Sequence, residues 1–176
     1  AQRALDFFPE ILTHVKGEWA GKPLRLERWQ QAIIANLFGW LRADGTRRYR
    51  EAFIYVPRKN GKTAIVAGLA NYLLFCDKEP GAEIYSAAAD RDQAALCFDM
   101  AKGMVTQSPH LTRLAQVFTK AITNERMAST YKAISADAHT KHGYNGHGVL
   151  IDELHAQPNR ELVDVLATST GARRQP

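Results

Sequence analysis

Apolar residues recur every three or four positions in two segments near the start of the chain. This spacing predicts two amphipathic helices. The first carries Phe7 and Ile11 on its apolar face, and the second spans roughly residues 27–41. A glycine-containing turn and a short arginine-rich stretch follow the second helix. We therefore expect an N-terminal helical segment over residues 1–45.

Continuous apolar runs and helical patterns alternate over the rest of the chain. The expected elements are a buried strand at 52–56, an apolar helix at 64–75, a strand at 83–87, a helix capped by Asp90 and ending near 104, short strands near 121 and at 131–135, a strand at 149–151, a helix led by Leu162 and a strand tip at 168–171. Alternation of this kind predicts an α/β fold with a mostly parallel sheet flanked by helices. We expect this α/β part of the domain to cover residues 46–176.

Length and composition agree with a single domain. The 176 residues are 45% hydrophobic, enough to bury a core without metal or disulfide support. Cys76 and Cys97 lie in apolar helical stretches, so we expect free thiols. No apolar run is long enough to span a membrane, and none resembles a signal peptide. Because the chain begins at Ala1 and ends abruptly at Pro176, we expect a fragment of a longer protein.

The net charge of +5 permits a polyanionic partner without indicating one. Arg47, Arg48 and Arg50 form a small basic cluster, which we interpret as a solvated loop able to contact phosphates.

A phosphate loop is indicated between the predicted strand at 52–56 and the following apolar helix. Its residues are Pro57, Arg58, Lys59, Asn60, Gly61, Lys62 and Thr63. In this strand-loop-helix arrangement, Lys62 neutralises terminal phosphates of ATP and the Thr63 hydroxyl is a Mg²⁺ ligand. Val56 stands where the usual Walker A pattern has its first glycine, so the pattern is incomplete.

An acidic pair follows the predicted strand at 149–151. Asp152 would hold Mg²⁺, directly or through water, and Glu153 would polarise the attacking water. The order of the phosphate loop and this pair along the chain favours ATP hydrolysis over phosphate transfer to a small substrate.

Two flanking segments add candidate nucleotide contacts. Gln30, next to Trp29, is either an adenine-contacting glutamine or part of a helix start with a buried tryptophan. The hydroxyl side chains of Thr168, Ser169 and Thr170 either sense the γ-phosphate from a strand tip or belong to an ordinary turn.

These motifs together resemble the ATPase half of phage terminase large subunits, especially those of long-tailed phages. The resemblance runs from Trp29 to Gly171 and implies a P-loop NTPase fold of the RecA/ASCE type. It implies that Arg58 and Glu153 are catalytic with Lys62, and that residues 168–170 couple hydrolysis to DNA movement. Members of that family also carry a C-terminal nuclease domain, and this chain stops before any such domain.

The resemblance further implies a ring-shaped homo-oligomer that drives double-stranded DNA into a capsid. Its partners would be the portal protein and the small terminase subunit, in the cytoplasm of an infected bacterial host. Each site of such a ring is completed by an arginine from the neighbouring subunit. Arg91, Arg113 and Arg126 are all candidates, and their spacing does not choose among them.

Two other functions remain open on the sequence. Asp152-Glu153-Leu154-His155 also matches the D-E-x-H box of helicases, and a decayed phosphate loop would make the chain a non-catalytic nucleic-acid-binding module. The histidines around the acidic pair (His139, His142, His147 and His155) lack a familiar zinc-ligand spacing. We expect them to belong to a mobile polar loop near the active site or DNA.

Overall fold

The structure, a computed structural model, describes residues 1–135 and 143–175, except for the side chains of Arg91 and Ala172. A single sheet of five strands organises this part of the chain. The elements are α1 (Gln2–Ile11), α2 (Arg28–Gly39), α3 (Lys62–Phe75), β1 (Glu83–Ala88), α4 (Arg91–Gln107), α5 (Pro109–Thr112), β2 (Ala115–Val117), β3 (Ala121–Asn124), η1 (Glu125–Met127), β4 (Ser129–Ser135), β5 (Gly146–Ile151), η3 (Leu154–Ala156), α6 (Glu161–Ser169) and η4 (Thr170–Ala172). No described helix is both long and apolar enough to cross a bilayer.

The strands lie in the order β2-β3-β4-β1-β5, and the sheet is mixed rather than mostly parallel. β1 pairs in parallel with β4 and β5, whereas β3 pairs antiparallel with β2 and β4. The short β2–β3 turn, closed by the Phe118 N–H donating to the Ala121 carbonyl at 2.8 Å, leaves no room for a crossover helix. Consecutive strands joined so tightly must run antiparallel.

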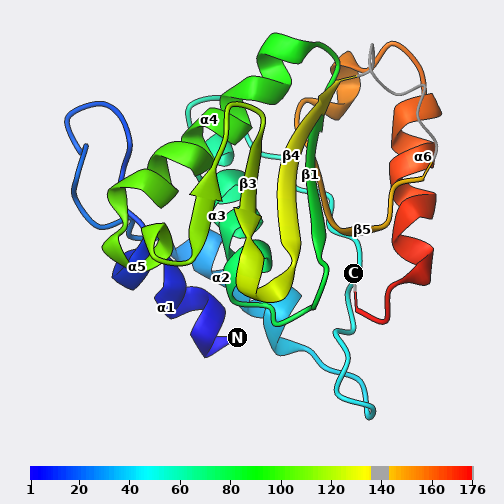
Figure 1. Cartoon of the computed structure of the whole chain (residues 1–176), viewed down its shortest axis with the longest axis horizontal. Coiled ribbons are helices and arrows are strands. Elements are labelled where there is room, and N and C mark those ends of the chain that lie inside the picture. Colours follow the sequence, from blue (N-terminus) through cyan, green and yellow to red (C-terminus); the bar gives the residue numbers. More distant parts are fainter. Residues whose placement is uncertain (136–142, 176) are drawn as a thin grey trace.

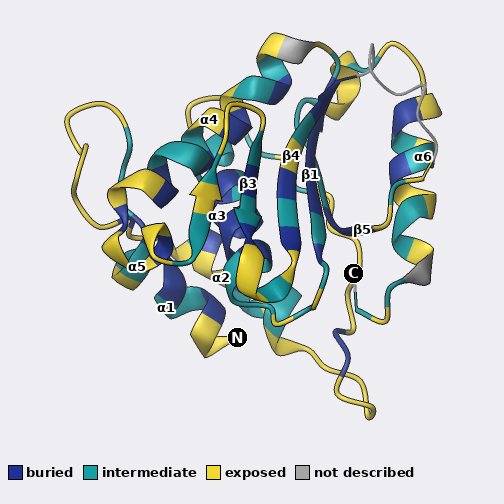
Figure 2. Cartoon of the chain, in the orientation of Figure 1, coloured by how far each residue is buried: buried dark blue, intermediate teal, exposed yellow. Residues whose placement is uncertain are grey.

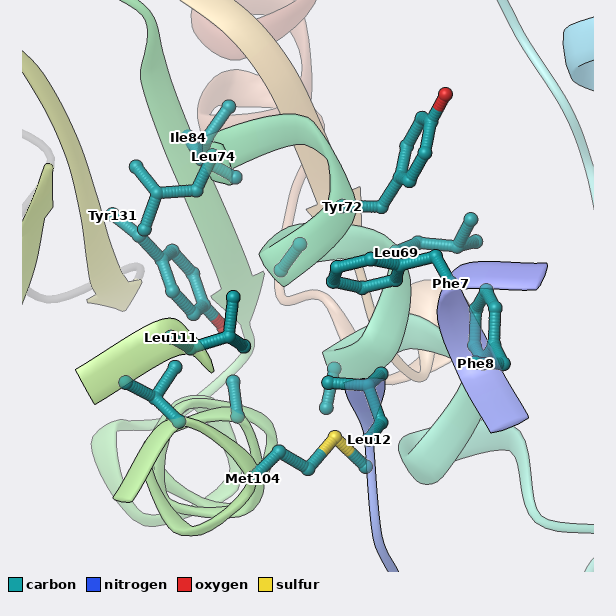
Figure 3. Packing of buried hydrophobic residues seen from close by; sticks show 14 of the residues in the cluster. Phe7, Phe8, Leu12, Leu69, Tyr72, Leu74, Ile84, Met104, Leu111 and Tyr131 are labelled. Carbon is teal, nitrogen blue, oxygen red and sulfur yellow. The ribbon is translucent and has the colours of Figure 1, made fainter. Parts of the chain in front are cut away.

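Helices cover the two faces of the sheet unequally (Figure 1). One face packs against α3 and α4, with α1 behind them, and this layer holds most of the buried apolar side chains (Figures 2 and 3). α6 covers the opposite face beside β5, where Leu162 and Leu166 pack against Tyr85 and Ala87. The predicted α/β class and helix positions are confirmed.

α1 docks on α3 through an aromatic contact that requires a glycine. A Cβ atom on Gly68 would lie only 2.4 Å from Cε1 of Phe8, which is fully buried. Phe7 meets the ring of Tyr72 edge-on at a centroid distance of 5.5 Å, and Figure 3 shows both phenylalanines turned toward α3. The N-terminal helix is therefore part of the same core as the sheet.

The strand predicted at residues 52–56 is wrong. These residues have no strand pairing in the described chain, and Phe53 and Tyr55 are 77% and 90% exposed. Their apolar character predicted a strand buried on both faces. A strand also needs a neighbour to accept its backbone hydrogen bonds, and β5 ends the sheet on its outer side without pairing to this segment.

The strand tip predicted at residues 168–171 is also wrong. Thr168 and Ser169 end α6, and Thr170 begins η4. Their hydroxyls donate to main-chain carbonyls three or four residues earlier, such as Thr168 Oγ1 to the Asp164 carbonyl at 2.9 Å. Such local hydrogen bonds satisfy these hydroxyls within a helix, so small polar residues here do not require an extended backbone.

A buried charged cluster joins the far ends of α3 and β5. Asp77 accepts hydrogen bonds at 2.9 Å from Arg47 Nη1, and its Oδ2 lies 2.6 Å from His147 Nε2. All three side chains are at least 94% buried, and Arg47 also donates to the Gln175 carbonyl at 2.7 Å. The solvated loop predicted for Arg47 and the mobile polar loop predicted for His147 are both wrong. Each side chain is buried against Asp77, a partner far away in the sequence.

Replacing Asp77 with asparagine should destabilise the fold strongly. The change leaves the guanidinium of Arg47 buried without a countercharge, and breaking a buried pair in this way costs about 3–5 kcal/mol. Urea unfolding should show a clearly lower midpoint for Asp77→Asn. The matched control is Asp99→Asn at an exposed position of α4. An equal midpoint for the two variants would contradict the role of the cluster.

The same cluster should make stability fall at acidic pH. Burial alone would raise the pKa of Asp77, but the hydrogen bond from His147 and the charge of Arg47 outweigh burial and lower it. A lowered carboxyl pKa contributes stability above the ordinary aspartate range and loses it as pH falls through the folded-state pKa. Acid titration of unfolding should therefore be steeper for the unchanged protein than for Asp77→Asn.

Candidate nucleotide-binding site

The loop before α3 has a backbone shape suited to an anion. Lys59 and Gly61 both have positive φ, at 66° and 71°, a conformation that recurs in loops whose N–H groups converge on an anion. The Asn60 amide group donates to the Pro57 and Arg58 carbonyls at 3.1 and 3.2 Å. The loop is therefore held in this shape by its own side chain.

α3 begins directly after the loop and opens with unsatisfied donors. Gly61 is its N-cap and supplies no side-chain cap, and the first intrahelical bond runs from the Ile65 N–H to the Gly61 carbonyl at 3.1 Å. The N–H groups before Ile65 have no intrahelical acceptor. Together with the charge of Lys62, they make this helix N-terminus suited to bind phosphate.

The acidic pair lies at the same place because β5 ends beside the start of α3. Lys62 Nζ donates to Glu153 Oε1 at 3.0 Å, and the two side chains are 27% and 32% exposed. The hydrogen bond from Lys62 lowers the pKa of the Glu153 carboxyl, and the charges of Lys62, His155 and Arg58 act in the same direction. The structure thus brings Lys62 and Glu153 together, as the sequence predicts, and the catalytic role of Arg58 remains a prediction.

Asp152 is the first residue after β5. Its N–H donates to the Ala87 carbonyl at 3.0 Å, which fixes it at the carboxyl edge of the sheet, and its Oδ1 accepts from the Glu153 N–H at 3.0 Å. Thr63 and Asp152 are both half-buried. One carboxylate and one hydroxyl fit Mg²⁺, which takes few protein ligands and completes its shell with water and phosphate oxygens.

Gln30 touches the phosphate loop while also capping a helix. Its Oε1 accepts from the Glu27 N–H at 2.8 Å in a capping box, and its Nε2 donates to the Asn60 carbonyl at 3.5 Å. Trp29 packs half-buried against the core. The structure therefore supports the helix-start interpretation, and a contact between Gln30 and adenine remains a prediction.

Residues 168–170 lie at the opposite end of β5 from the phosphate loop. A Cβ atom on Gly146, the first residue of β5, would lie 2.8 Å from the Ser169 hydroxyl. Asp152 is six residues further along the strand, about 20 Å away at the usual strand rise. The structure does not bring Thr168, Ser169 and Thr170 to Lys62, and their γ-phosphate contact remains a prediction.

The two histidines of this region that the structure describes, His147 and His155, have separate partners. His147 is buried in β5, and His139 and His142 lie outside the described residues. His155, in η3, is 74% exposed and places Nδ1 at 3.4 Å from Glu153 Oε2. This contact is not among the expectations drawn from the sequence, although the position of His155 two residues after Glu153 is a signal for it.

The fold and site define a nucleotide-binding α/β domain, and the comparisons place it in a family. A family model described as the ATPase domain of the terminase large subunit matches residues 28–176. The chain therefore belongs to the family of terminase large-subunit ATPase domains, and ATP is the nucleotide that such a domain hydrolyses. The helicase and non-catalytic alternatives are not favoured.

Known relatives agree with this membership. The chain is 28% identical to the terminase large subunit of Enterobacteria phage HK97 over 180 residues, covering 99% of this chain and 35% of the relative. The crystal structure of the HK97 bacteriophage large terminase superposes with a TM-score of 0.84 at 28% identity, covering 99% of this chain and 36% of that one. The chain thus spans about a third of the length of these relatives.

Asn60→Ala should weaken ATP binding about 2- to 10-fold, because it removes both side-chain hydrogen bonds that hold the phosphate loop in its shape before the nucleotide binds. The unfolding midpoint should change little, since Asn60 is exposed. Titration with a fluorescent ATP analogue measures the effect. Asn36→Ala, which removes two exposed side-chain hydrogen bonds at α2, is the control, and equal affinities would refute this role of Asn60.

Proposed function

We propose that this chain is the ATP-hydrolysing motor domain of a viral terminase large subunit, which drives double-stranded DNA into a capsid. The observation that carries the proposal is the 3.0 Å contact between Lys62 and Glu153. This contact joins Lys62, at the end of the phosphate loop, to Glu153, whose carboxylate is suited to activating water. The two residues are 91 positions apart in the sequence. Family membership and the likeness to the HK97 terminase support packaging as the use of this hydrolysis.

Each site residue has a role that follows from its position. Lys62 and the N–H groups at the start of α3 bind the phosphates, while the exposed Arg58 stabilises charge that develops on the γ-phosphate. Thr63 and Asp152 would hold Mg²⁺, which when bound supplies charge neutralisation between the phosphates. Glu153 accepts a proton from the attacking water. Pro57, Lys59 and Asn60 shape the loop, and Gln30 supports it from α2.

The wider assembly belongs to the same proposal. We propose a P-loop NTPase core of the RecA type, acting in a homo-oligomeric ring with the portal protein and the small terminase subunit, in the infected host cell. Arg113 and Arg126 are exposed and either can reach a neighbouring subunit as a trans-acting arginine, while the side chain of Arg91 is outside the described structure. Residues 168–170 would couple hydrolysis to DNA movement from the far end of β5.

Measuring ATP turnover by the purified chain tests the proposal most directly. Phosphate release should require Mg²⁺ and should rise when double-stranded DNA is added. Because an arginine from a neighbour contributes about three to five orders of magnitude in related enzymes, the isolated chain should turn over slowly and accelerate with assembly. Full-rate hydrolysis by a monomer at high dilution would contradict the trans arginine, and DNA-activated strand separation would instead support a helicase.

Lys62→Ala should impair ATP binding, whereas Arg58→Ala should impair ATP turnover. Lys62 contacts the β- and γ-phosphates from the helix start, so its removal should nearly abolish ATP binding. Arg58→Ala should still bind ATP and should lose mainly turnover per bound nucleotide, because its charge acts in the transition state. Affinity and steady-state phosphate release separate the two. Unchanged turnover in Lys62→Ala would remove the phosphate-loop assignment.

Glu153→Gln and Asp152→Asn should also separate binding from turnover. Glutamine keeps the size of Glu153 but removes its basicity, so ATP and Mg²⁺ should still bind while hydrolysis falls about 100- to 10,000-fold. Asp152→Asn removes the carboxylate at the end of β5 and should weaken Mg²⁺-dependent ATP binding itself. Near-normal phosphate release from Glu153→Gln would exclude Glu153 as the general base.

A further inference from the structure

Glu153 is held by two basic side chains at once. Lys62 Nζ lies 3.0 Å from Oε1 and His155 Nδ1 lies 3.4 Å from Oε2, so each carboxylate oxygen has its own partner. The backbone of Glu153 is left-handed, with φ 47° and ψ 53°, an uncommon conformation for a residue with a side chain. The position of this carboxylate therefore depends on its partners and on the turn into η3.

Phosphate and Glu153 compete for the same ammonium group. The Lys62 ammonium sits at the first position of α3, where the helix N-terminus binds phosphate, and Glu153 occupies it in this structure. A phosphate carries more charge than a carboxylate and also receives the N–H groups of the loop and helix. A bound phosphate therefore competes with the Glu153 carboxylate for Lys62 and weakens their contact.

Once Lys62 has turned to the phosphates, His155 is the partner that Glu153 retains. His155 lies in the 3₁₀ turn that immediately follows Glu153, so the contact does not depend on α3. Within the described residues, its exposed ring has no other ion-pair or hydrogen-bond partner. Because Nδ1 lies 3.4 Å from Oε2, a contact kept at that oxygen leaves Oε1 free to orient water.

We propose that Glu153 exchanges partners during the nucleotide cycle, passing from joint restraint by Lys62 and His155 to restraint by His155 alone, which makes His155 a positioning residue for the catalytic carboxylate. The proposal rests on the proposed function, since it takes the phosphate site and the role of Glu153 from it. The exchange has two parts that are measured separately. Release of Glu153 from Lys62 is measured by nucleotide affinity, and restraint of Glu153 by His155 is measured by ATP turnover.

The Lys62 half is tested by binding of Mg²⁺-ADP, which cannot be hydrolysed. Glu153→Gln should bind ADP about two- to fivefold more tightly than the unchanged protein, because a partly exposed ion pair of modest strength no longer competes for Lys62. The matched control, Glu51→Gln, removes the same charge from an exposed position before the loop and should leave the affinity unchanged. An ADP affinity of Glu153→Gln equal to that of the control would overturn the exchange.

The His155 half is tested by the split between ATP affinity and turnover per bound ATP. His155→Ala should keep the affinity within about twofold and lower turnover about tenfold, because a carboxylate displaced by about 1 Å orients water poorly. His155→Asn should restore most of the rate, since the asparagine amide donates from nearly the same place as Nδ1. His110→Ala, at an exposed position in α5, is the control.

The outcomes distinguish this proposal from the function on which it rests. His155→Asn as slow as His155→Ala, or His155→Ala as fast as His110→Ala, would overturn the positioning role while nucleotide binding and Lys62 dependence persist. Failure of the unchanged protein to bind ADP or ATP would instead overturn the proposed function. Tighter ADP binding by Glu153→Gln together with rescue by His155→Asn supports the whole exchange.

Discussion

The arrangement of the site depends on the buried contacts of the Asp77 carboxylate with Arg47 and His147. Asp77 lies just after α3, it binds His147 near the start of β5, and it neutralises Arg47 from the 40–48 region before the phosphate loop. α3 and β5 are the two elements that bring Lys62 and Glu153 together. A buried charge is unfavourable without its partners. Any shift of α3 relative to β5 at the Asp77 end would therefore expose or unpair Arg47, Asp77 or His147.

The two elements are thus joined at both ends by contacts of different strength. At the far end the groups are almost fully buried, and at the site end Lys62 and Glu153 are each about a third exposed. Partly exposed pairs are weak, whereas unpairing a buried one is costly. Only the contact at the site end can exchange partners readily, and this end carries the proposed phosphate site.

Sequence patterns were sufficient for the parts of the fold that depend on local properties. The all-round apolar segment after Lys62 predicted α3, Asp90 caps α4 through its side chain as predicted, and the strand before Asp152 is β5. The meeting of Lys62 and Glu153 could also be predicted, because a loop before a helix and an acidic strand end share one edge of a sheet.

Features that depend on partners distant in sequence could not be predicted in this way. Residues 52–56 have the composition of a strand but no paired neighbour in the described chain, and composition does not reveal pairing. Arg47 and His147 have polar side chains, so their burial follows only from Asp77, which is 30 and 70 residues away. Residues 168–170 are helical because their hydroxyls bond locally, an option equally open to them in a turn.

The distances in sequence within the Asp77 cluster also bear on folding kinetics. Its hydrogen bonds join residues 30, 70 and 128 positions apart, the last between Arg47 and the Gln175 carbonyl. Closing such long loops is entropically unfavourable until the sheet between them has formed, so these contacts arise late. Interactions absent from the folding transition state chiefly slow unfolding. We therefore expect the cluster chiefly to slow unfolding of the native state. Its loss would shorten the lifetime of the folded domain more than it would slow folding.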